Sequence, residues 1–316
     1  MAEADPQANP KPEPTEGRRL FKELLSAERM ADIKVQEAAI AKLWQLVAEW
    51  QNDEPSAWLQ CMGEAGQRAA VFDWAGTEAA YQRAVKAAGD NTGLLSKTYD
   101  DLRAWHSLMG ERPQAKAAAR SATEAARRLG IPSMLFLRLQ AEARLAIDAG
   151  DLPLARANLT EAFAAIGAGG RPDLPRANAV ILQADYFIAA GELEKAETDL
   201  TSAWEILRPQ GEANFAGGWQ SSLASWWSAT AHWRALQGDS AGAVSAWREA
   251  VTRSRIVANV PQMEGPFKHN ALAKSLWNLG CALQLVGDGA AGYALAESDA
   301  IRQKIGLPPL GETGRG

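Results

Sequence analysis

The chain has 316 residues, of which 47% are hydrophobic, and 33 basic against 38 acidic side chains give a formal net charge of −5. This apolar content suits a soluble protein with one large or two medium domains. Because the net charge is negative, the chain has no excess of positive charge to bind anionic surfaces, and we expect neither nucleic acid nor a membrane as partner. Only two cysteines occur, Cys61 and Cys281, which fits reduced thiols and a cytoplasmic location better than a disulfide framework.

The N-terminal region divides into two parts by composition. Residues 1–17 are rich in Pro, Glu and Ala and contain no aromatic residue, so we expect a disordered tail without a signal peptide. Residues 18–52 contain no Pro and no Gly after Arg18, and their apolar residues follow a helical pattern that predicts one or two helices capping the region that follows. The apolar positions are Leu20, Leu24, Met30, Ile33, Ala38, Ile40, Leu43, Val47 and Trp50.

A short turn sequence then recurs about every 40–50 residues, which is the signature of a repeat architecture. Glycine followed by Asp or Glu supplies a residue that tolerates positive φ and a side chain that can cap the next helix. The turns lie near residues 72, 110, 150, 191, 238 and 287, and at the first of them Phe72 stands where the others have glycine.

Small residues recur at fixed offsets from these turns. Antiparallel helices approach to about 8–10 Å only where small side chains stand at the crossing point, so the pattern predicts a series of helical hairpins that stack on one another. Before the turns stand Ala65, Ala143, Ala184, Ala231 and Gly280, and after them stand Ala115, Ala155, Ala196, Ala243 and Gly292.

A tryptophan-rich helix is predicted for residues 219–237. Trp219, Leu223, Trp226, Thr230 and Trp233 recur at steps of four and three, so they share one helical face. Because exposure of several tryptophans would forgo more free energy than a domain's net stability, we expect them in the core between helices. A pocket lined by one or more of them is the alternative.

These motifs resemble the tetratricopeptide repeat family. The matching residues are Trp227, Ala231, Gly238, Ala243, Trp247 and Ala250 in one hairpin, and Leu276, Leu279, Gly280, Leu283 and Gly287 in the next. The resemblance implies an all-α fold, a right-handed superhelical solenoid of about six such hairpins over residues 56–305. The segment Asn270 to Ile305 is similar to repeats of the kinesin-light-chain type, and residues 306–316 are expected to form a C-terminal tail.

In that family the first helices of the repeats bind peptides or partner helices on the concave side. Carried over position by position, the resemblance implies a mixed polar groove, with a solvated face that binds nothing as the alternative. The residues that would contact the partner are Lys97, Asp100, Gln140, Arg144, Asn178, Asp185, Ser228, His232, Lys274, Trp277 and Gln284.

Groups with catalytic or metal-binding spacing are missing from the sequence. His106, His232 and His269 are the only histidines, and none stands three or four residues from another His or from a Cys. We therefore expect no metal, no cofactor, no catalytic residue and a non-enzymatic adaptor that binds another protein or a peptide. The main alternative is a sensor or regulatory subunit that binds a small molecule or short peptide and controls a separate enzyme. Self-association through the segments after Arg208 and Arg255 is a further prediction.

Overall fold

The structure, a computed structural model, describes residues 55–167, 174–211, 217–260 and 265–310. The chain divides into two compact units, Met1–Ser56 and Ala57–Gly316, and the second contains nearly all described residues. The tail predicted for residues 1–17 and the capping helices predicted for 18–52 lie outside the described residues.

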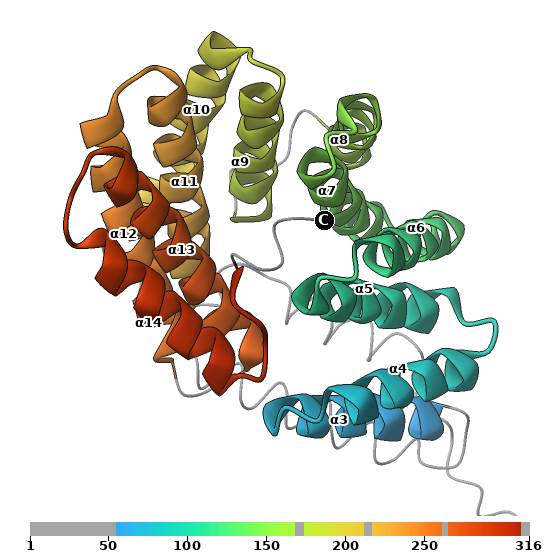
Figure 1. The fold of residues 1–316 in the computed structure, drawn as a ribbon. Helices are drawn as coiled ribbons and strands as arrows, with labels where there is room; N and C mark the ends of the chain where they lie inside the picture. The colour runs from blue at the N-terminus through green and yellow to red at the C-terminus, as the bar shows by residue number, and fades with distance from the viewer. Residues whose placement is uncertain (1–54, 168–173, 212–216, 261–264, 311–316) are drawn as a thin grey trace, which may run out of the picture. The chain divides into compact units, whose positions relative to one another are not determined.

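All regular elements of the described residues are helices, and the twelve helices follow one another in pairs (Figure 1). The first helices of the pairs are α3 (Pro55–Ala70), α5 (Thr92–Met109), α7 (Pro132–Asp148), α9 (Leu174–Ala189), α11 (Gly217–Leu236) and α13 (Pro266–Leu285). The second helices are α4 (Trp74–Ala88), α6 (Arg112–Leu129), α8 (Leu152–Ile166), α10 (Leu193–Gly211), α12 (Ser240–Ala258) and α14 (Ala291–Lys304).

Contacts between these helices are those of a linear array. From α4 to α14, each helix packs against the next one along the chain. In addition, α7 contacts α9, and α9 contacts α11, so the first helices of these three consecutive pairs lie side by side. This all-α repeat arrangement agrees with the solenoid predicted from the sequence.

The predicted turns adopt the backbone conformation for which glycine is needed. Gly238 has φ +82°, and Asp239, which follows it, accepts a hydrogen bond from the Gly242 N–H at 2.8 Å. The same pairing of a left-handed glycine with a capping Asp occurs at Gly150 and Asp151. Phe72 is the only non-glycine with positive φ among the described residues, and it marks the one divergent turn.

Replacing Gly238 by alanine should lower the free energy of unfolding by about 1 kcal/mol, because a Cβ is disfavoured at positive φ. Gly63 is the matched control, since it lies inside α3, a Cβ added to it would have no atom within 4 Å, and its φ is not positive. Gly63→Ala should therefore raise stability by about 0.5–1 kcal/mol. Urea denaturation of both variants measures the difference, and equal effects of the same sign would contradict it.

Nine of the ten small residues of the predicted pattern are buried. Ala231 and Ala243 are 0% and 2% exposed, and a Cβ added to Gly280 would lie 2.6 Å from the Leu295 side chain. The expectation for Gly292 is wrong, because this residue is exposed and has no neighbour within 4 Å of a Cβ. An extra turn before α14 shifts the register, so that Leu295 instead of Gly292 meets Gly280.

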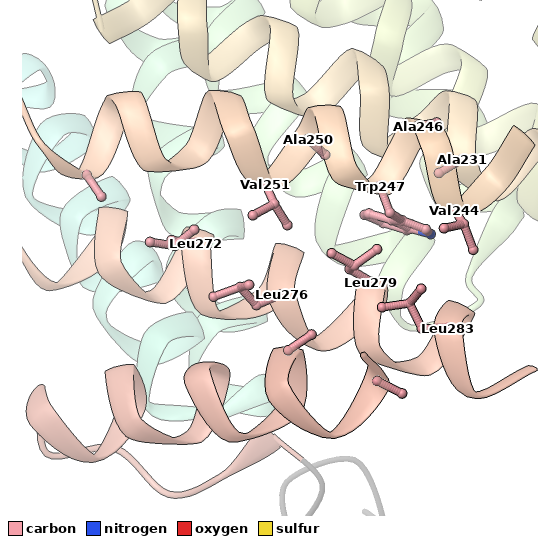
Figure 2. Packing of buried hydrophobic residues seen from close by; sticks show 13 residues of the cluster. Ala231, Val244, Ala246, Trp247, Ala250, Val251, Leu272, Leu276, Leu279 and Leu283 are labelled. Atoms are coloured by element: carbon pink, nitrogen blue, oxygen red, sulfur yellow. The ribbon is translucent and has the colours of Figure 1, made fainter. Parts of the chain in front are cut away.

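The most extensive core cluster joins the last two described pairs. Figure 2 shows the Trp247 ring of α12 beside Val244 and Leu279, and the row of buried side chains continues through Val251 and Leu276. This cluster fixes α12 against α13.

The tryptophans of α11 belong mainly to the core, as predicted. Trp226 stacks on Trp204 with ring centroids 4.5 Å apart, and its Nε1 donates to the Leu200 carbonyl at 2.7 Å. Trp233 likewise donates to the Leu193 carbonyl at 3.0 Å. These hydrogen bonds and ring contacts hold α11 against α10.

Asp199 of α10 is a partly buried acid whose Oδ2 has no hydrogen-bond partner among the described residues. Burial raises its pKa from 3.8 to about 6. The folded state therefore holds the proton more tightly than the unfolded state, and stability is lost as the pH rises from about 4 to about 6.

Asp199→Asn should remove this dependence and raise the free energy of unfolding at pH 7.5 by about 1–2 kcal/mol after allowance for solvent screening. At pH 4 the variant and the wild type should be nearly equal. Glu197→Gln on the exposed side of α10 is the matched control, and thermal melts from pH 4 to 8 measure the effect. A parallel pH profile for Asp199→Asn and wild type would refute this account.

The C-terminal segment packs against the first described pairs instead of forming a tail from Gly306. Ile305 and Leu307 are 1% and 4% exposed and form a cluster with Leu108 of α5, with Trp74 of α4 packed against it. The Leu307 N–H also donates to the Arg302 carbonyl at 2.9 Å, which ends α14 in a tight turn. Within the second unit, the last helix is thus joined to α4 and α5. Residues 311–316 lie outside the described residues.

Candidate functional site

A cavity of about 270 Å³ opens among five helices, α7, α9, α11, α12 and α13, and we call it the groove hollow. The first helices among these are the ones whose inner faces were predicted to bind a partner. The residues lining it are Arg144, Asp185, Ser221, Ala224, Ser225, Ser228, Ala229, His232, Trp247, Ser254, Val257, Lys268, Ala271, Lys274, Ser275 and Asn278.

The groove hollow exists because the residues of α11 and α13 that face it are small. Ala224, Ser228, Ala271 and Ser275 leave space where larger side chains would fill it. The hydroxyl of Ser228 donates to the Ala224 carbonyl at 2.8 Å, and that of Ser275 to the Ala271 carbonyl at 3.1 Å. These carbonyls also belong to helix turns, so the hydroxyls can rotate toward a ligand at little cost.

An ion pair bridges the first helices on one side of the groove hollow. Arg144 of α7 donates to the Asp185 carboxylate of α9. Burial lowers the pKa of Arg144, but the Asp185 carboxylate outweighs this effect and the pKa lies above its ordinary value. The only carboxylate lining the hollow is therefore already neutralised.

His232 and Lys274 line the groove hollow, where each side chain keeps an exposed surface while the surrounding helices limit its hydration. Burial among the surrounding helices lowers the pKa of His232, an effect that Asp185 partly opposes and Arg144 reinforces. The His232 ring also meets Trp247 edge-on, with centroids 4.9 Å apart. At neutral pH His232 is thus a neutral hydrogen-bonding group.

The surrounding helices limit the hydration of the Lys274 ammonium group and so lower its pKa as well. Asp148 opposes this effect, and the positive charges of Arg302, Arg144 and Arg112 add to it. Burial raises the pKa of Asp148 in turn, so neither partner fully compensates the other. Lys274 forms no ion pair with another described residue, and it lines the groove hollow together with Arg144 and Lys268.

Five of the eleven predicted contact residues line the groove hollow, namely Arg144, Asp185, Ser228, His232 and Lys274. The other six do not line it. Lys97 pairs with Asp101, Asp100 pairs with Arg103 and Arg138, and the Gln140 amide donates to the Phe136 carbonyl. Asn178 and Gln284 are exposed outside it, and Trp277 is half-buried.

The sequence prediction missed the contribution of α12. Trp247, Ser254 and Val257 line the groove hollow from a second helix, although the family register placed only first helices there. The prediction also missed Ser221 and Ser225 of α11. Their spacing could have indicated them, because steps of four and three from Ser221 to Ser228 put three hydroxyls on one face of this helix.

A second cavity, of about 280 Å³, lies among α8, α9 and α10. Its lining includes Phe187 with the Lys195 ammonium 5.3 Å from the ring centroid, and Arg156 and Glu192 at the rim. Lys195 is already paired with Glu192. None of the eleven predicted contact residues lines this cavity.

The described residues contain no group of three or more His, Cys, Asp or Glu side chains that could hold a metal ion. Among the same residues, no helix is both long and apolar enough to cross a membrane. The lining of the groove hollow offers hydrogen-bonding groups and charge, from hydroxyls, an amide and cations.

Comparisons with known proteins give a fold similarity and nothing closer. No protein-family model matches the chain, and no curated protein matches it. Among solved structures, the chain is similar to the crystal structure of BtubC (BKLC) from P. vanneervenii. The sequence identity is 17% and the TM-score 0.47, with 81% of this chain and 93% of that chain covered. A similarity at this level says nothing about what this chain binds.

Proposed function

We propose that the protein is a non-enzymatic interaction scaffold, a right-handed tetratricopeptide-type solenoid that binds a partner protein or peptide in the cytoplasm. The binding surface is the inner face or an end of the helix array. The paired helices, the glycine turns and the buried alanines support this assignment of the fold. We also propose that the last repeat is of the kinesin-light-chain type.

The observation that carries the proposal is the convergence of five helices on one hollow in which polar residues are exposed. Ser225, His232 and Lys274 are exposed there, while the alanines and leucines of the same helices form the cores. An end of the array is the other candidate surface, since Tyr293 of α14 is 83% exposed.

Site-specific photo-crosslinking in the native cell tests both surfaces. A benzophenone amino acid at Ser225 reports on the groove hollow, the same amino acid at Tyr293 reports on the end of the array, and at Lys86 of α4 it serves as control. We expect one protein to be crosslinked from one of the two surfaces and not from Lys86. Identical crosslinks from all three positions, or none from any, would count against a scaffold.

A sensor of a small molecule is the second candidate function, and the size and polarity of the groove hollow favour it. A cavity of about 270 Å³ lined by serines and cations is nearer to a small-molecule site than to the long apolar groove that takes a helix. Thermal shift against the low-molecular-weight fraction of a cell extract separates the two functions, because a scaffold responds only to the protein fraction. Loss of the shift in Ser225→Trp would locate the effect in the groove hollow.

A further inference from the structure

The groove hollow has no large apolar side chain available to a ligand. Trp247 and Val257 are the only large apolar residues in its lining, and only 4% and 7% of their surface is exposed. A partner helix binds mainly through apolar anchors that enter apolar pockets. The lining therefore favours a ligand recognised by hydrogen bonds and charge.

The charges around the groove hollow favour an anion. Arg144, Lys268 and Lys274 line it, whereas Asp185 is its only acid and is paired with Arg144. Lys268 donates to the Val260 carbonyl and adds its positive charge to the lining. A bound anion would act on Lys274 in the same direction as Asp148, which favours the charged ammonium group, and against the limited hydration and the nearby arginines, which disfavour it.

We propose that the groove hollow binds a small organic anion with two or more anionic oxygens, held by Lys274 and by the hydroxyls of α11. Di- and tricarboxylates and sugar phosphates share this chemistry, and all are of the size that the cavity admits. The proposal rests on the sensor function and is independent of partner binding.

A free anion fits the described residues better than an acidic peptide. A peptide would continue from the groove hollow along the inner faces of α7 and α5, where it would need further cations. There Arg138 is already held by Asp100, and Arg103 by the same carboxylate. Lys274 lines the groove hollow itself, which favours a ligand that fits inside this cavity.

Isothermal titration of the full chain at low ionic strength tests the proposal with succinate, citrate and glucose 6-phosphate as probes. Inorganic sulfate is the control for unspecific anion binding, and a capped hexaglutamate peptide represents the peptide source. We expect at least one organic anion to bind at a single site and more tightly than sulfate and the peptide. Binding of succinate or citrate would indicate a carboxylate ligand, and binding of glucose 6-phosphate would indicate a phosphate ligand.

Three variants locate the binding. Lys274→Gln and Ser225→Trp should each weaken it at least about tenfold, since one removes a charge-assisted contact and the other fills the cavity. Lys304→Gln, on an exposed lysine that does not line the groove hollow, should change the affinity less than about twofold. Only three histidines occur, so the ring resonance of His232, assigned with His232→Gln, should shift on saturation.

Several outcomes would overturn the proposal. They are no saturable binding of any organic probe, equal binding of sulfate, equal affinity in Lys274→Gln and Lys304→Gln, or tighter binding of the peptide. Circular dichroism of Lys274→Gln and Ser225→Trp shows whether the variants are folded, and both residues are exposed in the wild type. A protein crosslinked from Ser225 or Tyr293 would leave the scaffold function intact even if no anion binds.

Discussion

Replacing Asp100 by alanine should lower the free energy of unfolding by about 3–5 kcal/mol, because it leaves the buried guanidinium of Arg138 unpaired. Arg138 of α7 reaches across to α5, where it contacts the Asp100 carboxylate and donates to Ser96 Oγ at 3.1 Å. The Arg138 side chain is only 8% exposed. Burial lowers its pKa, and Asp100 is the main charge that opposes this effect.

The exposed pair Arg127–Glu161 is a matched control, since it also joins neighbouring helix pairs and lies in the same part of the array. Its side chains are 45% and 40% exposed, so Glu161→Ala should cost less than about 1 kcal/mol. Chemical denaturation of both variants measures the contrast. Equal losses would show that burial of Arg138 does not determine the cost.

A double variant separates the unpaired charge from the lost contact. Asp100→Ala with Arg138→Met removes both charges and keeps most of the buried volume, so it should recover about half or more of the stability lost in Asp100→Ala. No recovery would mean that the lost contacts of Asp100, which include its pair with Arg103 on the same helix, determine the cost, and that the unpaired charge does not.

The hairpin register could be predicted from the sequence because its determinants are local or act between adjacent helices. Glycine is needed at position 238 because the backbone there has a positive φ. Alanine is needed at positions 231 and 243 because two helices joined by one short turn approach each other closely there. The last hairpin escaped the prediction because its turn is longer, which moved the contact with Gly280 from Gly292 to Leu295.

The groove hollow could be predicted only in part. A helical register states which face of α7, α9 or α13 is inner, and Arg144, Asp185 and Lys274 were found in this way. Whether an inner residue stays available depends on partners from other helices. Asp100 forms an ion pair with Arg138, which lies 38 positions away in the sequence, and no periodicity predicts this pairing. The tilt between pairs that brings Trp247 to the hollow is likewise a property of the packed array.

The position of the C-terminal segment could not be predicted, since Leu307 contacts residues about 200 positions earlier, beyond the range of any repeat pattern. Gly306 and the prolines after Leu307 are typical of an exposed tail. Nevertheless, a Cβ added to Gly306 would lie 3.1 Å from Trp74 Nε1. A positive φ of +69° and the close approach to α4, not flexibility, account for glycine at this position.

Leu307→Ala should lower the free energy of unfolding by about 2–4 kcal/mol, the usual cost of emptying a buried leucine site. Leu307 is 4% exposed, whereas Leu285 at the end of α13 is 86% exposed and provides the matched control. Leu285→Ala should change stability by less than about 0.5 kcal/mol. Urea denaturation of the two variants measures the difference.

The same substitution should also reduce the cooperativity of unfolding. In a linear array each pair is stabilised by its neighbours, and the end pairs have only one neighbour each. The cluster of Ile305, Leu307 and Leu108 gives α14 and α5 an additional shared contact. Hydrogen exchange of Leu307→Ala should therefore show lost protection in α4, α5 and α14 together, with little change in α9 and α10. Loss confined to α14 would mean that the contact stabilises only the helix that carries it, and that the two ends of the array unfold independently.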